Sequence, residues 1–226
     1  MTAMLDGKRV LITQADAFMG PPLCETFSAH GALVVADSAL LAEPGTAESV
    51  VGAAGEVDVL VANLAIPAPT TPAPQVSDEE FRQVFAHLVD PLPRLVRAVV
   101  PQMMERGHGV ILVMGSAAAL RGMRRASTYS AARGAQLAYV QAVGVELASH
   151  GIRVNAIAQN FVDNPTYFPP RVQHDPRFQD RLRREVPLGR LVSAREDAEF
   201  AAYLCSDAAA CFVGQVFPVS GGWAVR

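Results

Sequence analysis

The sequence predicts an α/β protein in which a doubly wound parallel sheet forms a single domain over residues 1–226. Three observations predict this class. Six short apolar runs alternate with longer segments that carry helix signals, the element order of doubly wound sheets. The runs are continuously apolar, so we expect both faces of each strand to be buried, as in a parallel sheet. With 226 residues, half of them hydrophobic, the chain is long enough for one core.

The apolar runs place the strands. In chain order, the predicted strands cover residues 8–13, 32–37, 57–63, 109–116, 152–158 and 215–222. The stretch between Asp37 and Val57 is too short for a full strand–helix–strand excursion. We therefore expect a trimmed, Rossmann-like sheet, with its functional groups at the carboxyl ends of the strands.

Local signals place the two longest helices. Ser77 precedes three acidic residues, which is typical of an N-cap and first turn, and predicts a helix that runs to about Arg106. Two prolines near the middle of this segment lack an N–H, so the helix must bend or break there. Another helix is predicted to begin near Ser127 and to end before Gly151, because glycine suits the left-handed position after a helix.

Composition excludes several classes of function. The net charge of −3 argues against a nucleic-acid or anionic membrane surface, and we interpret the arginine-rich run 181–185 as a solvated face. Three cysteines without a CxxC pair argue against a disulfide scaffold or a zinc site, and they suit a reducing cytoplasm. No apolar run approaches the roughly 20 residues that span a bilayer. We therefore expect a cytoplasmic protein without membrane or nucleic-acid partners.

Three polar residues form a candidate catalytic group. Ser116 ends the fourth predicted strand, and Tyr129 and Arg133 follow thirteen and seventeen positions later. The last two lie four apart on a predicted helix, so their side chains share a face. A guanidinium beside a phenol favours the phenolate, which makes Tyr129 a candidate base with Ser116 as its hydrogen-bonding partner. Taken singly, these residues could be a turn cap, a packed aromatic and a surface charge; their joint spacing favours catalysis.

The turn after the first strand is unusual for a dinucleotide-binding loop. Gln14 and Phe18 stand where two glycines are expected, and only Gly20 remains. Glycines at such a turn let backbone N–H groups approach a pyrophosphate at the start of a helix. Side chains at these positions occupy that space, and we expect Phe18 to project into the volume that a nicotinamide would take. We interpret the loop as rebuilt, not damaged.

The segment GSAAALRGMRRASTYSAAR (115–133) resembles the catalytic segment of the short-chain dehydrogenase/reductase superfamily, with one departure. Arg133 replaces the lysine that in those enzymes also binds the nicotinamide ribose. Together with the pattern Thr13-x4-Phe18-x-Gly20, this departure resembles the halohydrin dehalogenases, most closely their B-type enzymes. The stretch IAQNFVDNPTYFPP (157–170) is similar to the halide-binding loop of that family, and the likeness covers nearly the whole chain.

The resemblance implies a lyase that converts vicinal haloalcohols into epoxides and halide, and that opens epoxides with small anions in reverse. Ser116, Tyr129 and Arg133 are then the catalytic residues, and no cofactor or metal takes part. The implied residues of the halide and substrate site are Phe18, Gln159, Asn160, Phe161, Val162 and Tyr167. The halide donors implied are backbone N–H groups around residues 160–162. The implied assembly is a homotetramer, in which Trp223 either reaches a neighbouring subunit or packs locally.

Two other functions stay open at this point. The chain could be an NAD(P)-dependent oxidoreductase with an atypical loop. Asp37, at the end of the second strand, would then hold a ribose, although an ordinary turn residue is the preferred interpretation. It could also be a sensor that binds a small metabolite without catalysis, which would leave the spacing of Ser116, Tyr129 and Arg133 unexplained.

Overall fold

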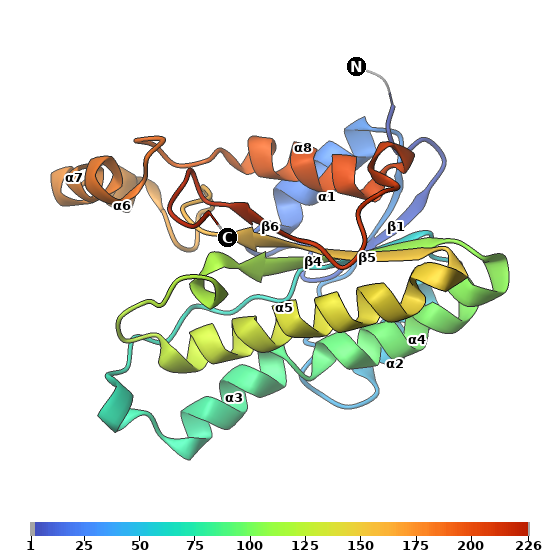
Figure 1. The fold of residues 1–226 in the computed structure, drawn as a ribbon, viewed down its shortest axis with the longest axis horizontal. Helices are drawn as coiled ribbons and strands as arrows, with labels where there is room; N and C mark the ends of the chain where they lie inside the picture. Colours follow the sequence, from blue (N-terminus) through green and yellow to red (C-terminus); the bar gives the residue numbers. More distant parts are fainter. Residues whose placement is uncertain (1–2, 226) are drawn as a thin grey trace.

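A six-stranded parallel sheet lies at the centre of the computed structural model, which describes residues 3–225. The strand order is β2-β1-β3-β4-β5-β6, and every neighbouring pair is parallel. The strands are β1 (Arg9–Ile12), β2 (Leu33–Ala36), β3 (Val59–Ala62), β4 (Gly109–Ser116), β5 (Ile152–Gln159) and β6 (Val216–Val219) (Figure 1). Each strand falls within or beside one predicted apolar run, and the predicted fold class is confirmed.

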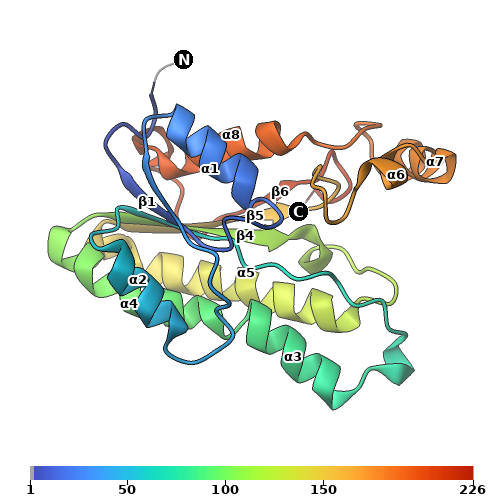
Figure 2. The same ribbon diagram turned by 180° about the vertical axis from the view of Figure 1, so that it is seen from behind.

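Helices cover both faces of the sheet. Helices α1 and α8 pack together on one face, and α2, α4 and α5 cover the other, where α3 packs against α5 (Figures 1 and 2). The helices are α1 (Gly20–Ala29), α2 (Thr46–Ala54), α3 (Asp78–Leu88), α4 (Pro91–Arg106), α5 (Ser127–Leu147), α6 (Pro170–Gln173), α7 (Pro176–Glu185) and α8 (Ala194–Cys205). Helices α6 and α7 project beyond the carboxyl ends of β4 and β5 (Figure 1). Within the described residues, no helix combines the length and apolarity that a bilayer span needs.

Local chemistry accounts for the break between α3 and α4. The Ser77 hydroxyl accepts a hydrogen bond from the Glu80 N–H at 3.1 Å and begins α3 as predicted. The chain then restarts as a new helix at Pro91, because proline is well suited to the first position of a helix, where its missing N–H leaves no bond unmade. The predicted interruption is confirmed.

The connection between β2 and β3 differs from the prediction. It does contain a helix, the nine-residue α2, so the strand–helix–strand excursion is complete and the expectation of a trimmed connection is wrong. Gly45 and Gly55 bound this helix at positive φ angles of 85° and 73°, which glycine adopts readily and which let the chain turn sharply at both ends. These sharp turns let a short segment hold a helix.

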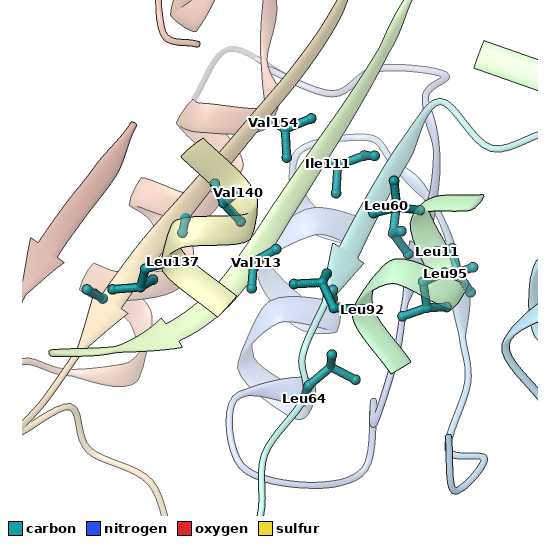
Figure 3. Packing of buried hydrophobic residues seen from close by; sticks show 14 of the residues in the cluster. Leu11, Leu60, Leu64, Leu92, Leu95, Ile111, Val113, Leu137, Val140 and Val154 are labelled. Atoms are coloured by element: carbon teal, nitrogen blue, oxygen red, sulfur yellow. The ribbon is translucent and has the colours of Figure 1, made fainter. Parts of the chain in front are cut away.

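The hydrophobic core lies on both sides of the sheet. All residues of β3 and β4 are buried, whereas the edge strand β2 is only partly covered. On one face, strand residues such as Leu60 and Ile111 meet Leu92 and Leu95 of α4 and Leu137 of α5 (Figure 3). Each fully buried leucine contributes about 1.5–3 kcal/mol. The doubly buried central strands explain why their apolar runs are continuous.

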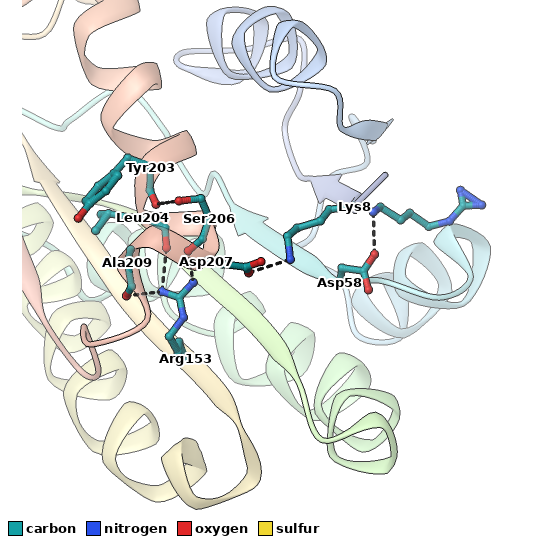
Figure 4. A network of polar contacts seen from close by, with 9 residues as sticks. Lys8, Asp58, Arg153, Tyr203, Leu204, Ser206, Asp207 and Ala209 are labelled. Atoms are coloured by element: carbon teal, nitrogen blue, oxygen red, sulfur yellow. Dashed lines mark hydrogen bonds and ion pairs between the residues drawn. The ribbon is translucent and has the colours of Figure 1, made fainter. Parts of the chain in front are cut away.

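A polar network occupies the amino edge of the sheet. Arg153, at the start of β5, donates hydrogen bonds to the carbonyl oxygens of Leu204 (2.9 Å), Ser206 (2.9 Å) and Ala209 (3.1 Å) (Figure 4). The guanidinium thereby satisfies carbonyls at the end of α8 that have no partner within the helix. Nearby, Lys8 pairs with Asp207 at 3.0 Å. This edge anchors α8 and leaves the opposite, carboxyl edge for the site.

Candidate active site

A cavity of about 310 Å³ opens at the carboxyl edge of the sheet. Its walls come from the loop after β1, the ends of β3 and β4, the start of α5, the segment after β5, and α7. Open α/β sheets place their ligands at this edge. Every residue that the sequence analysis assigned to catalysis or to halide and substrate binding lines this cavity: Phe18, Ser116, Tyr129, Arg133, Gln159, Asn160, Phe161, Val162 and Tyr167.

Arg133 is locked behind Tyr129. It is 3% exposed, and its Nη1 donates to the Leu64 carbonyl (2.8 Å), the Met114 carbonyl (3.1 Å) and Gln136 Oε1 (2.9 Å). The Arg133 Cζ lies 5.1 Å from the centre of the Tyr129 ring. A buried guanidinium with fixed neighbours places a permanent positive charge beside the phenol.

The pKa of Tyr129 lies below its ordinary value of 10. Burial is the largest single influence and acts to raise this pKa, because it penalises the charged phenolate. The positive charge of Arg133, together with the polar side chains of Tyr167 and Ser116, outweighs burial and lowers this pKa. Arg133 thus favours the phenolate form of Tyr129, which makes Tyr129 a candidate general base.

Ser116 serves the local backbone and the cavity together. Its Oγ accepts a hydrogen bond from the Ala118 N–H at 3.2 Å, so the turn-capping interpretation describes a real contact. That contact uses the oxygen as an acceptor and leaves the hydroxyl hydrogen free. Ser116 can therefore donate to a ligand oxygen while Tyr129 accepts from it.

The structure brings Tyr167 beside Tyr129, an arrangement that sequence reasoning missed. The Tyr167 hydroxyl donates to the Ile66 carbonyl at 2.7 Å, and its ring centre lies 5.6 Å from that of Phe18. Burial, followed by the neighbouring Tyr129, raises the pKa of Tyr167, so it remains a neutral hydrogen-bond donor. Asn164 Oδ1 accepts the backbone N–H of Tyr167 at 3.0 Å and positions it. The Asn164-x2-Tyr167 spacing is the sequence signal for this turn.

In the loop after β1, Gln14 and Phe18 stand at two positions where glycines are expected, and both adopt a glycine-like backbone conformation. Gln14 and Phe18 adopt φ angles of 44° and 52°, in the left-handed region that glycine favours. Gln14 Oε1 accepts the Ala65 N–H at 2.6 Å, which ties the loop to the segment after β3. A Cβ on Gly20 would lie 2.3 Å from the Gln14 carbonyl oxygen, so this glycine is required by close packing. The Gln14 side chain thus joins the loop to the segment after β3, and the Phe18 side chain lines the cavity.

The start of α1 does not fit a nicotinamide dinucleotide. A pyrophosphate at such a site is held by free backbone N–H groups of the first helical turn. Here the N–H groups of Gly20 and Leu23 already donate to the carbonyls of Ala17 (2.8 Å) and Met19 (3.0 Å). The two residues between them are prolines and have no N–H. The first four residues of α1 thus offer no donor to a phosphate.

Asp37 behaves as a turn residue. Its Oδ1 accepts the Ala39 N–H at 2.9 Å, which closes a local turn after β2. Asp37 does not line the cavity that contains Tyr129. The interpretation of Asp37 as an ordinary turn residue agrees with the structure.

The loop after β5, residues 160–168, presents one free backbone N–H among the three that the resemblance implies as halide donors. The Asn160 N–H donates to the Val219 carbonyl (3.1 Å), and the Phe161 N–H donates to Asn160 Oδ1 (2.8 Å). Among the described residues, only the Val162 N–H of these three makes no hydrogen bond. Gln159, at the start of the loop, donates to the buried carboxylate of Asp197 in α8. The loop is therefore held by α8 and β6, and the Val162 N–H is the one of these three donors that is free to bind a ligand.

Two further side chains complete the wall around Phe161. The Trp223 ring lies 6.0 Å from the Phe161 ring and is 6% exposed, so Trp223 packs within its own chain. Arg181 of α7 lines the cavity, and its Cζ lies 5.2 Å from the centre of the Phe161 ring. Arg181, Arg183 and Arg184 are exposed, as the interpretation of residues 181–185 as a solvated face predicts, and Arg181 in addition lines the cavity.

The chain is similar in sequence and in fold to reductases and to dehalogenases. Residues 23–224 match the family model described as Enoyl-(Acyl carrier protein) reductase. The 3-oxoacyl-[acyl-carrier-protein] reductase FabG of Escherichia coli (strain K12) is 30% identical over 96% of this chain and 97% of its own. A solved structure described as a dehalogenation enzyme has a TM-score of 0.92 and 32% identity, covering 98% of this chain and 100% of that chain. The structure of halohydrin dehalogenase HheC bound to ethyl (2S)-oxiran-2-ylacetate has a TM-score of 0.88 and 28% identity. The match covers 97% of this chain and 98% of that chain.

Proposed function

Since the chain belongs to the short-chain dehydrogenase/reductase superfamily, we propose that it is a halohydrin dehalogenase that works without a nicotinamide cofactor. It converts a vicinal haloalcohol into an epoxide and halide. The start of α1 carries this proposal: it offers no free N–H to a pyrophosphate, and the adjoining Phe18 lines the same cavity as Tyr129. The likeness to two dehalogenase structures supports it.

The reaction begins with proton removal. The substrate hydroxyl binds between Ser116 and Tyr129, and Ser116 donates to its oxygen. The Tyr129 phenolate, stabilised by Arg133, takes the hydroxyl proton. The resulting alkoxide attacks the neighbouring carbon, forms the new C–O bond of the epoxide and expels the halide with the electrons of the carbon–halogen bond. Tyr129 then releases its proton to solvent, so the net products are an epoxide, a halide ion and a proton.

The leaving halide needs stabilisation where its charge develops. The free N–H of Val162 and the edges of the Phe18 and Phe161 rings provide it, since aromatic edges carry partial positive charge. A large, polarisable anion suits such a weakly polar lining. In the reverse direction, azide, cyanide or nitrite enters the same place and opens an epoxide while Tyr129 donates the proton.

Release of chloride from 1,3-dichloro-2-propanol, measured with no nicotinamide present, tests this proposal. We expect chloride and an epoxide in equal amounts, and a loss of about 10²–10⁴-fold in rate for Tyr129→Phe, because the general base is removed. Tyr203→Phe is the matched control, since Tyr203 lies on α8 outside the cavity.

The sequence relatives favour one competing function, an NAD(P)-dependent oxidoreductase. That function would give no chloride from a panel of short haloalcohols and would show measurable binding of NADH or NADPH. A small-molecule sensor would bind haloalcohols and leave them unchanged. Either result would remove the dehalogenase proposal.

A further inference from the structure

Helix α7 places a single cation on the wall of the cavity. The arginines of this helix are all exposed, and among them Arg181 alone lines the cavity. The Arg181 guanidinium lies over the ring of Phe161, with 5.2 Å between Cζ and the ring centre. Contact with an aromatic ring limits the positions that a long side chain samples. Arg181 is thus held at the cavity wall.

The outer edge of this guanidinium is available to a ligand. Its Nε donates to Glu185 Oε2 at 3.1 Å, and neither terminal nitrogen makes a hydrogen bond to any described residue. The two terminal nitrogens form a planar fork whose spacing matches the two oxygens of a carboxylate. A halide is a single sphere and cannot use both arms of the fork in this way.

The charge around the cavity favours an anion. Of the described residues that line the cavity, two are arginines and none is aspartate, glutamate or lysine. Arg133 is committed to the backbone and to Tyr129. Glu185 is shared between Arg181 (3.1 Å) and Arg184 (3.5 Å), so one carboxylate faces two guanidinium groups. A positive charge remains to be balanced at the cavity wall.

We propose that Arg181 binds a carboxylate carried by the substrate, so that the site prefers haloalcohols and epoxides with an acidic group over their neutral counterparts. Ser116 and Tyr129 engage the hydroxyl, and Arg181 engages the far end of the same molecule. This inference rests on the proposed function and names its substrate class. Arg181 acts on specificity and takes no part in the bond-making step.

A matched pair of substrates tests this inference. Dehalogenation of 4-chloro-3-hydroxybutanoate is compared with that of its ethyl ester in the wild type, in Arg181→Gln and in the control Arg177→Gln. Arg177 is an exposed arginine one turn earlier on α7, outside the cavity. Because the Arg181 side chain is 47% exposed, solvent weakens the pairing, and we expect Arg181→Gln to lower kcat/KM for the acid by about three- to tenfold, mostly through KM. The ester should be unaffected, and Arg177→Gln should change neither substrate.

Three results would overturn the inference. An equal loss for acid and ester would mean that Arg181 only supports the fold. No change in kcat/KM for either substrate in Arg181→Gln would mean that no carboxylate is bound there. No change for either substrate, combined with weaker product inhibition by bromide, would assign Arg181 to the halide instead.

Binding of unreactive ligands separates this inference from the proposed function. Trp223 is the only tryptophan of the chain and lies 6.0 Å from Phe161, so its fluorescence reports on this wall. We expect 3-hydroxybutanoate to bind more tightly than its ethyl ester, and Arg181→Gln to remove that difference. If the fluorescence difference is present but no halide is released from either chlorinated substrate, the carboxylate site stands and the dehalogenase proposal fails. If halide is released without any acid preference, the reverse holds.

Discussion

Single residues at this site are held in costly conformations. Gln14, Phe18 and Phe161 have positive φ angles of 44°, 52° and 52°, and all three belong to the two loops that shape the cavity. A side-chain-bearing residue in this region costs on the order of 1 kcal/mol, and such strain gathers at functional sites. The strain directs the Phe18 and Phe161 rings to the cavity. Their placement is consistent with a binding role.

Arg133 is the residue whose chemistry distinguishes this site most clearly. One Nη of its guanidinium reaches two backbone carbonyls and Gln136, while its Cζ stays near the Tyr129 ring. A lysine ammonium is a more compact charge with three donors on a flexible stem, and it cannot reproduce this planar arrangement. The position of the positive charge, and with it the pKa of Tyr129, therefore depends on arginine.

The forward reaction requires the phenolate, so its rate rises with pH through the pKa of Tyr129, which lies below 10. In Arg133→Lys this pKa should rise, and the acid limb of the chloride-release profile should move to higher pH. A shift of about one unit would correspond to about a tenfold lower rate at neutral pH. The profile of chloride release against pH checks this. Epoxide opening by azide, which needs protonated Tyr129, is the internal control and should not weaken at neutral pH for this reason. An unmoved acid limb would contradict the role given to Arg133.

Among the elements, α8 supports the loop after β5, residues 160–168. The Val192 N–H donates to the Phe161 carbonyl at 2.9 Å, and the Asp163 N–H donates to the Val192 carbonyl at 2.8 Å, just before the helix begins. Ser193 and Glu196 then form a capping box that fixes the start of α8. One turn further, Asp197 accepts from Gln159. The loop and the start of α8 therefore form one hydrogen-bonded unit.

Asp197 makes the stability of this unit depend on pH. Burial raises its pKa to about 7, and the hydrogen bond from Gln159 opposes that rise. In the unfolded chain the carboxyl ionises near 3.8, so between pH 4 and 7 the native state binds more protons than the unfolded state. The stability from this group is present at low pH and is lost as pH rises through 7. Asp197→Asn removes this ionisable group. The free energy of unfolding of the variant, relative to that of the wild type, should therefore be higher at pH 8 than at pH 4 by on the order of 1–3 kcal/mol. Urea unfolding at both pH values measures this; an equal effect at both would contradict it.

On the scale of the whole molecule, the two edges of the sheet have different tasks. The amino edge carries the network of Arg153, Lys8 and Asp207, which fastens α8 to the sheet (Figure 4). The carboxyl edge carries the cavity, with α7 over its wall. Separating the rigid edge from the ligand edge lets loops vary at the site without disturbing the sheet.

We propose a homotetramer, as the resemblance implies. Light scattering after size-exclusion chromatography should then give four times the chain mass of 24.0 kDa. Val145 on α5 is 73% exposed, and an apolar side chain this exposed on a long outer helix is suited to an interface. We expect Val145→Glu to shift the protein toward smaller species. A mass of 24.0 kDa for the wild type would exclude the tetramer.

Much of the fold follows from the sequence by itself. Apolar runs predicted all six strands, and burial on both faces explains the continuous runs of the central strands β3 and β4. The expected burial fails at the edge strands β2 and β6, which are only partly covered. Ser77 and Pro91 predicted the start of α3 and the break before α4, since caps and prolines act on their own backbone. The spacing of Ser116, Tyr129 and Arg133 predicted that these side chains meet, because a strand end and one helix face determine their positions.

Only the tertiary structure decided the rest. Folding brings Arg181 next to Phe161 and Tyr167 next to Tyr129, although the members of each pair lie far apart in the chain. Local sequence patterns do not predict such contacts. The Asn160 side chain occupies the Phe161 N–H, which leaves Val162 as the donor. Helix α2 fits between β2 and β3 because two glycines bend sharply. Elements follow from local chemistry, whereas loops and the site they enclose follow from how those elements pack.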